Sequence, residues 1–144
     1  MKVTINGDLI GNVVTVPIAA AAPAFFTNSG TVIDALDANF KLIGTGNPAK
    51  RGQTVLFYAN GLGAVTNTPA SGDPAAGNPL SKTPTPVVTI GGQQAVVSFS
   101  GLTPSLPGLY QLNVTVPSNI TAGVQNVTMS IGGVTSPVAT LPVQ

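Results

Sequence analysis

The chain has 144 residues, a length suited to one domain or to one domain with an appendage. Hydrophobic residues make up 43% and charged residues only 6%, with a formal net charge of +1. His, Cys, Trp and Glu are absent, which excludes disulfide bonds, zinc and copper sites and most acid–base catalysis, and the weak charge gives no reason to expect nucleic acid.

The composition also predicts where the protein works. A surface with so few charges must consist mainly of Thr, Ser, Asn, Gln, Gly and Ala, which is unlike a protein kept soluble by charge. We therefore expect an extracellular or cell-surface module without cofactors. No apolar run reaches the roughly 18 residues of a membrane helix, because Pro17 and Pro23 interrupt the stretch 13–26, so we expect no membrane insertion.

The first 24 residues are predicted to form a separate arm. Residues 2–5 and 12–18 have the short, β-branched character of strands, and Asn6-Gly7 supplies a hairpin turn between them. An Ala-rich linker over residues 19–24 then joins this hairpin arm to the rest of the chain. We assign residues 1–24 to the arm and linker and residues 25–144 to one domain.

The remaining residues predict an all-β fold. Gly and Pro recur every few residues, and short Val/Thr/Ile/Phe runs with period-2 alternation lie between them. The predicted strands cover residues 31–36, 40–43, 53–59, 86–90, 95–100, 108–116, 125–131 and 137–143. Many short strands with such turns indicate a β-sandwich, whereas the Pro/Gly/Asn-rich segment 66–85 is predicted to be a long loop. The expected core residues are Phe57, Ile90, Val97, Phe99, Leu112, Val114, Val127 and Ile131.

One hairpin pattern occurs three times, at Thr4-Ile5-Asn6-Gly7, Thr89-Ile90-Gly91-Gly92 and Ser130-Ile131-Gly132-Gly133. The first and third copies match further, because residues 13–18 (Val-Val-Thr-Val-Pro-Ile) align with residues 138–143 (Val-Ala-Thr-Leu-Pro-Val). The arm therefore resembles the hairpin that closes the chain. Either it is the remnant of a preceding repeat, or it pairs with another chain.

From Ala22 onward, the chain resembles the Ig-like C-terminal domain that recurs in large, uncharacterised secreted proteins of Solibacter and other Acidobacteria, and the Ile-Gly-Gly hairpin is similar to IPT/TIG-type domains. The pieces that carry the resemblance are residues 22–27 (APAFFT), 47–52 (NPAKRG), 58–63 (YANGLG), 88–92 (VTIGG), 108–114 (GLYQLNV) and 116–117 (VP). The resemblance implies an Ig-like Greek-key β-sandwich in an exported bacterial protein, and it implies no catalytic residues.

The candidate sites are few. Asp34, Asp37 and Asn39 could supply oxygen ligands to calcium, but a turn held by Asx side chains is the favoured interpretation. Gly61-Leu62-Gly63 resembles part of a phosphate-binding loop, yet no helix pattern follows it, so a tight loop is favoured. A possible binding surface comprises Tyr58, Asn60, Asp73, Tyr110, Lys50 and Arg51.

These observations predict a non-catalytic structural or adhesive module, not an enzyme. Its expected partners are neighbouring modules or identical chains, bound through the N-terminal hairpin, with polysaccharide as a further candidate. A carbohydrate-binding module, with Tyr58, Tyr110 and the 66–85 loop as its surface, is the alternative. A hydrolase using Asp, Lys and Ser is a distant third interpretation, because no Ser-x-x-Lys spacing provides a nucleophile with a base.

Overall fold

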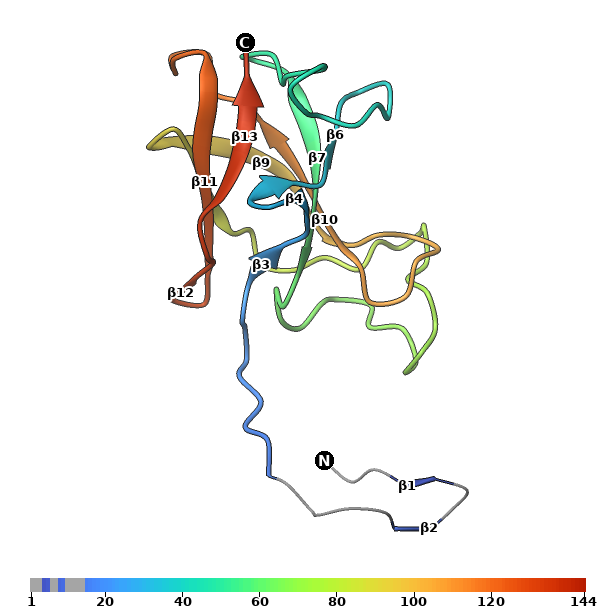
Figure 1. Cartoon of the computed structure of the whole chain (residues 1–144). Helices are drawn as coiled ribbons and strands as arrows, with labels where there is room; N and C mark the ends of the chain where they lie inside the picture. The colour runs from blue at the N-terminus through green and yellow to red at the C-terminus, as the bar shows by residue number, and fades with distance from the viewer. Residues whose placement is uncertain (1–3, 6–7, 10–14) are drawn as a thin grey trace.

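A computed structural model describes residues 4–5, 8–9 and 15–144 (Figure 1). Within these residues the protein is all-β and contains no helix. The strands are β1 Thr4–Ile5, β2 Asp8–Leu9, β3 Ala24–Phe25, β4 Thr27–Ser29, β5 Val32–Ile33, β6 Ala35–Leu36, β7 Thr54–Asn60, β8 Val87–Ile90, β9 Gln93–Leu102, β10 Tyr110–Thr115, β11 Gly123–Ile131, β12 Val134–Thr135 and β13 Ala139–Val143.

Eleven of these strands form one mixed sheet. Its order is β3-β7-β10-β9-β8-β11-β13-β5-β4, with β6 also paired to β7 and β12 to β11. The neighbours are antiparallel except β5 and β13, which run parallel. The strands β3 and β4 follow each other in the chain but lie at the two ends of this order, so residues 24–29 bring the ends together and the sheet nearly closes into a barrel.

The core fills the inside of this barrel. In β7 the alternation predicted from the sequence is confirmed, since Val55, Phe57 and Ala59 are buried whereas Leu56 and Tyr58 face outward. The ring of Phe25 meets the ring of Phe57 edge to face at a centroid distance of 5.7 Å. Six predicted core residues are confirmed as buried: Phe57, Ile90, Leu112, Val114, Val127 and Ile131.

The prediction was wrong for Phe99, and Val97 is only partly buried. Val97 pairs with Val114 on the inner face, but Phe99 pairs with Asn113, whose side chain lies on the outer face. Ser98 has no partner in this register and forms a β-bulge. Because side chains alternate with a period of two, one extra residue moves Phe99 to the other face of the sheet.

The repeated hairpins share one geometry. Ile5 pairs with Asp8, Ile90 with Gln93, and Ile131 with Val134, so in each case two residues separate the paired positions. Gly91, Gly92, Gly132 and Gly133 all have positive φ angles between 59° and 80°, as two-residue hairpin turns require. The first turn, Asn6-Gly7, lies outside the described residues.

Other strand predictions need correction. Residues 15–18 form no strand, and residues 12–14 lie outside the described residues. The segment 40–43 contributes only an isolated bridge between Leu36 and Leu42, flanked by the backbone hydrogen bonds of Asp37 to Lys41 (2.9 Å) and of Ile43 to Ala35 (2.8 Å). The short strands β3, β4 and β12 were not predicted, since two or three residues are too few to show a period.

The long loop is present, since no strand lies between β7 and β8. Its return segment is fixed along the end of β9, where Leu102 donates its backbone N–H to Ser81 (2.9 Å) and Thr83 donates to Ser100 (3.0 Å). A Cβ added to Gly101 would lie 2.1 Å from the carbonyl oxygen of Ser81. The loop is thus held by close backbone packing that only Gly permits.

Two ends of the barrel can be distinguished in Figure 1. The loop end carries the β7–β8 loop, the β9–β10 loop and the β11–β12 turn, and the linker leaves the barrel there. The C-terminal end carries Gln144, whose N–H donates to the carbonyl of Ala49 (2.9 Å). The two connections of the domain therefore lie at opposite ends.

Candidate functional site

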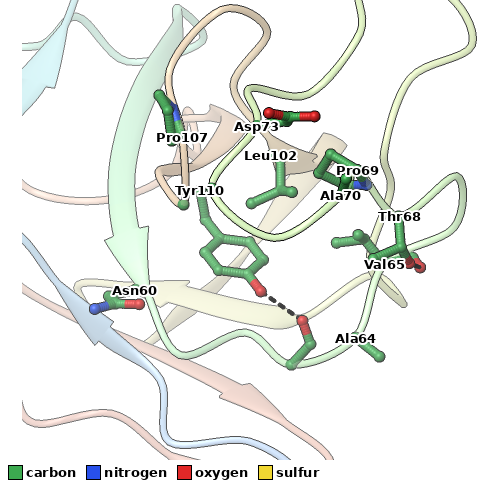
Figure 2. A pocket seen from close by; sticks show the side chains of 13 residues that line it. Asn60, Ala64, Val65, Thr68, Pro69, Ala70, Asp73, Leu102, Pro107 and Tyr110 are labelled. Atoms are coloured by element: carbon green, nitrogen blue, oxygen red, sulfur yellow. Dashed lines mark hydrogen bonds between the residues drawn. The ribbon is translucent and has the colours of Figure 1, made fainter. Parts of the chain in front are cut away.

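Three of the six predicted surface residues line one hollow at the loop end of the barrel (Figure 2). The hollow has a volume of about 580 Å³ and lies between the first part of the long loop and the β9–β10 loop. Asn60, Asp73 and Tyr110 contribute polar atoms, and Val65, Pro69, Ala70, Leu102 and Pro107 supply most of the apolar lining.

Tyr110 starts β10 with its ring on the inner face, where Ala59 is its neighbour on β7. Its hydroxyl donates to the carbonyl of Gly63 at 2.5 Å, as the dashed line in Figure 2 shows. Partial burial of the phenol raises the pKa of Tyr110 above its ordinary value. Through this hydrogen bond, Tyr110 holds the start of the long loop that forms the hollow.

The other tyrosine lies elsewhere. Tyr58 points outward from β7 and lines a smaller groove of about 300 Å³. The groove is lined by Phe26, Asp34, Leu36, Leu42, Tyr58 and Leu109. Since Tyr58 and Tyr110 lie on opposite faces of the sheet, they do not form one planar aromatic surface of the kind that stacks on a sugar chain.

Lys50 and Arg51 lie at the C-terminal end of the barrel, whereas the hollow lies at the loop end. Their turn is fixed by hydrogen bonds, since Lys50 donates its backbone N–H to the Gln53 side chain (3.1 Å) and Arg51 donates its backbone N–H to Gln144 (3.3 Å). One guanidinium nitrogen of Arg51 also donates to the carbonyl of Ile120 at 3.3 Å. The structure therefore does not bring the six predicted residues together.

Asp37 organises a turn. Its Oδ1 accepts the backbone N–H groups of Asn39 (2.8 Å) and Lys41 (3.0 Å), and its Oδ2 accepts from the Asn47 amide (3.2 Å). These hydrogen bonds, led by the one from Lys41, lower the pKa of Asp37 below its ordinary value of 3.8. Among the described residues, no three Asp, Glu, His or Cys side chains gather as metal ligands would. The turn interpretation fits this geometry.

Gly61 and Gly63 have a role that was not predicted from the sequence. Both have positive φ, but their main constraint is the linker that crosses them: Ala22 donates its N–H to Gly61 at 2.8 Å. A Cβ on Gly61 would lie 2.0 Å from the carbonyl oxygen of Ala22, and one on Gly63 would lie 2.6 Å from that of Ala20. The signal in the sequence was the run of Ala at 19–22, since small residues allow two backbones to approach.

Comparison of the chain with protein-family models, with curated proteins and with solved structures gives no match. Over residues 4–5, 8–9 and 15–144, no helix is long and apolar enough to cross a membrane.

Proposed function

We propose that this chain is a non-catalytic structural or adhesive module of an exported bacterial protein, located outside the cell or at its surface. Its domain is an Ig-like Greek-key β-sandwich, and its N-terminal hairpin connects it to a neighbouring module or to an identical chain. The all-β architecture, the low charge and the family resemblance described above support this proposal.

The observation that carries the proposal is the different environment of two matching segments. Val16 and Ile18 of the arm are 55% and 94% exposed, whereas the aligned residues Leu141 and Val143 of β13 are 0% and 4% exposed. Exposed apolar area costs about 25 cal/mol per Å², so such residues favour a place inside a core. We infer that residues 13–18 are the closing strand of another module of the same kind.

Support for a non-catalytic role comes from the two groups whose pKa values are shifted. Asp37 is occupied by backbone and amide donors of its own turn, and Tyr110 is occupied by the carbonyl of Gly63. Catalytic groups are usually tuned by burial and by charged neighbours in a cleft. Here the pKa of Asp37 is lowered by the hydrogen bonds of its own turn, and the Tyr110 hydroxyl, whose pKa is raised by burial, is already bonded to the long loop.

A segment exchange tests the proposal. Residues 138–143 would be replaced by residues 13–18, which places Val14, Val16 and Ile18 at the buried positions of Ala139, Leu141 and Val143. If the arm is a closing strand, the chimera should unfold cooperatively with a midpoint within about 5 °C of the parent, since the buried side chains stay apolar and each changes in size by only about one or two carbons.

The matched control is a chimera that carries the same six residues shifted by one position. It turns the apolar side chains outward and should lose cooperative unfolding. Equal behaviour of the two chimeras, or unfolding of both, would show that residues 13–18 are not a closing strand.

A second candidate, a carbohydrate-binding module, is favoured by the hollow that Asn60, Asp73 and Tyr110 share. Binding to a panel of soluble polysaccharides tests it. Asp73→Ala is the informative variant, because its side chain is exposed in the hollow, and Lys50→Ala at the opposite end is the control. Specific binding that only Asp73→Ala removes would support this candidate over the structural one.

A further inference from the structure

We propose that the loop end of the barrel is a docking surface for a module of the same kind, and that the linker fixes the two modules end to end without slack. This inference rests on the proposed function, because it needs residues 13–18 to be the closing strand of the docked module. It adds where that module sits and which residues hold it.

The linker lies on a seat on the barrel, defined here as Gly61, Gly63 and Gly132. Ala22 is hydrogen-bonded to Gly61, the carbonyl of Ala20 lies against Gly63, and the Ala21 methyl packs on the core, 3.9 Å from a Cβ position on Gly132. The next residue, Pro23, is buried. The linker is thus bound backbone to backbone from Ala20 onward, and it does not behave as a free tether.

The alignment of the arm with β13 fixes which arm residue corresponds to the C-terminal residue of the barrel. If Ile18 occupies the position of Val143 in its own module, then Ala19 occupies that of Gln144. In the described domain, Gln144 is still attached, because its N–H donates to Ala49 and its carbonyl accepts from Arg51. Ala19 would be held in the same way by the C-terminal end of the docked module.

The seat of the linker and the alignment of the arm together leave no free residue between the modules. Ala19 belongs to the C-terminal end of one module, and Ala20 already belongs to the seat on the loop end of the next. Consecutive Cα atoms are about 3.8 Å apart, so the two ends must touch. The docked module would then cover the loop end, where Leu106 and Val134 are half exposed and where the hollow opens.

This arrangement and carbohydrate binding make opposite predictions for the hollow. A docked module restricts access to Asp73, whereas a sugar-binding site needs Asp73 open. The partner is specified by the chain itself: a β-barrel whose closing strand runs directly into Ala20.

A tandem protein tests the inference. The full chain would be followed directly by residues 20–144, so that Gln144 takes the place of Ala19. Since the chain has no Cys, Val96→Cys in each copy gives two unique sites for spin labels, at an exposed position on β9. Pulsed electron paramagnetic resonance then measures the distance distribution between the two modules, and we expect one narrow population.

The matched variants are Gly63→Ala and Gly72→Ala in the second copy. Their φ angles are nearly the same, +87° and +88°, but a Cβ at position 72 meets nothing within 4 Å. Backbone strain is therefore common to both, and only Gly63→Ala displaces the linker. We expect a broad distribution for Gly63→Ala and a narrow one for Gly72→Ala.

An insertion variant keeps the test decisive if Gly63→Ala fails to fold, and hydrogen exchange adds a second readout if it folds. Insertion of Gly-Ser-Gly-Ser between Gln144 and Ala20 should broaden the distribution while the Ala22 amide of the second copy stays protected from hydrogen exchange. In the single full chain, Ala22 should exchange about tenfold faster in Gly63→Ala than in Gly72→Ala, as loss of one hydrogen bond implies.

If the distance distribution of the parent tandem is as broad as that of the insertion variant, the modules do not dock. If Gly63→Ala and Gly72→Ala give the same distance distribution and the same Ala22 exchange rate, Gly63 does not hold the linker. Neither result depends on the segment exchange, which tests only the identity of residues 13–18. If the segment-exchange chimera folds but the tandem protein gives a broad distance distribution, the modules are repeats that a flexible linker joins.

Discussion

Asp37 is the residue with the most organised polar environment in the described chain. Its carboxylate accepts three hydrogen bonds and closes the turn that leads from β6 to the bridge at Leu42. Each of these bonds favours the ionised form, which is why its pKa is lowered. The folded protein therefore holds this proton less tightly than the unfolded chain does.

The sign of the pH effect follows from this difference. A carboxyl with a lowered pKa contributes stability above its unfolded pKa, about 3.8, and loses it as the pH falls toward the lower folded value. The melting temperature should therefore fall as the pH drops below about 4, and Asp37→Asn should be less stable at neutral pH with a flatter acid profile. Thermal melts from neutral pH downward measure both.

Asp73→Asn is the control, because Asp73 is an exposed loop carboxylate. It should keep the parent profile. If Asp37→Asn melts with the same pH dependence as the parent, the hydrogen bonds of this turn do not govern acid stability.

At the scale of single elements, β9 shows how one bulge redirects a strand. Phe57 is fully buried inside the barrel, whereas the bulge at Ser98 places Phe99 on the outer face, partly exposed. Phe57→Ala should cost about 3–5 kcal/mol, since it leaves a core cavity. Phe99→Ala should cost only about 1–2 kcal/mol, since it removes partly solvated area. Denaturant unfolding of both variants gives the comparison, and equal losses would place Phe99 in the core after all.

The long loop depends on the β9 residue that it crosses. Gly101→Ala would bring a methyl within 2.1 Å of the Ser81 carbonyl, so the return segment of the loop should detach. We expect cleavage in the loop by a non-specific protease to become about tenfold faster, because opening loses at least one backbone hydrogen bond. Gly77→Ala is the matched control, since it lies in the same loop and its Cβ meets nothing within 4 Å. Cleavage at equal rates would show that the loop is held elsewhere.

The elements also show which features a sequence can predict. The alternation in β7 and the Gly-Gly turns were predicted correctly, because period and turn chemistry are local properties. The position of Phe99 was not, because a bulge is set by pairing with β10 and leaves no mark on the period of β9. The hollow could not be predicted either, since Asn60, Asp73 and Tyr110 meet only through the path of the long loop.

At the scale of the whole molecule, the arm and the linker should contribute differently to stability. Residues 15–20 are exposed, whereas Ala21 and Pro23 are at least partly buried and Ala22 donates its N–H to Gly61. Removing residues 1–18 should leave the melting temperature of the barrel within about 1 °C of the parent. Removing residues 1–22 should lower it by about 3–6 °C, since a hydrogen bond of about 1 kcal/mol and the packing of Ala21 are lost.

Differential scanning calorimetry of the two truncated proteins makes this comparison, with light scattering to follow their association. An equal melting temperature for both would mean that the linker contributes nothing to the barrel. A loss of stability already in the shorter deletion would instead show that residues 1–18 contact this barrel or another copy.

The parallel pairing of β5 and β13 has a mechanical consequence. The chain enters the barrel at the loop end and leaves at the opposite end from β13, so tension along the polypeptide pulls β13 and its parallel neighbour β5 in opposite directions. Their bonds are then loaded in shear and must break together, including Thr140 N–H to Thr31 (2.8 Å) and the hydroxyl pair of Thr31 and Thr140 (3.1 Å). Force-driven unfolding depends on the unfolding rate.

In single-molecule stretching, Thr140→Val should lower the rupture force, because it removes the hydroxyl pair beside β5. Thr115→Val, which breaks a hydroxyl pair of equal length between β7 and β10, should not lower it. Equal rupture forces would mean that the load passes through other strands; a selective loss would mean that this small, sparsely charged barrel is built to carry tension.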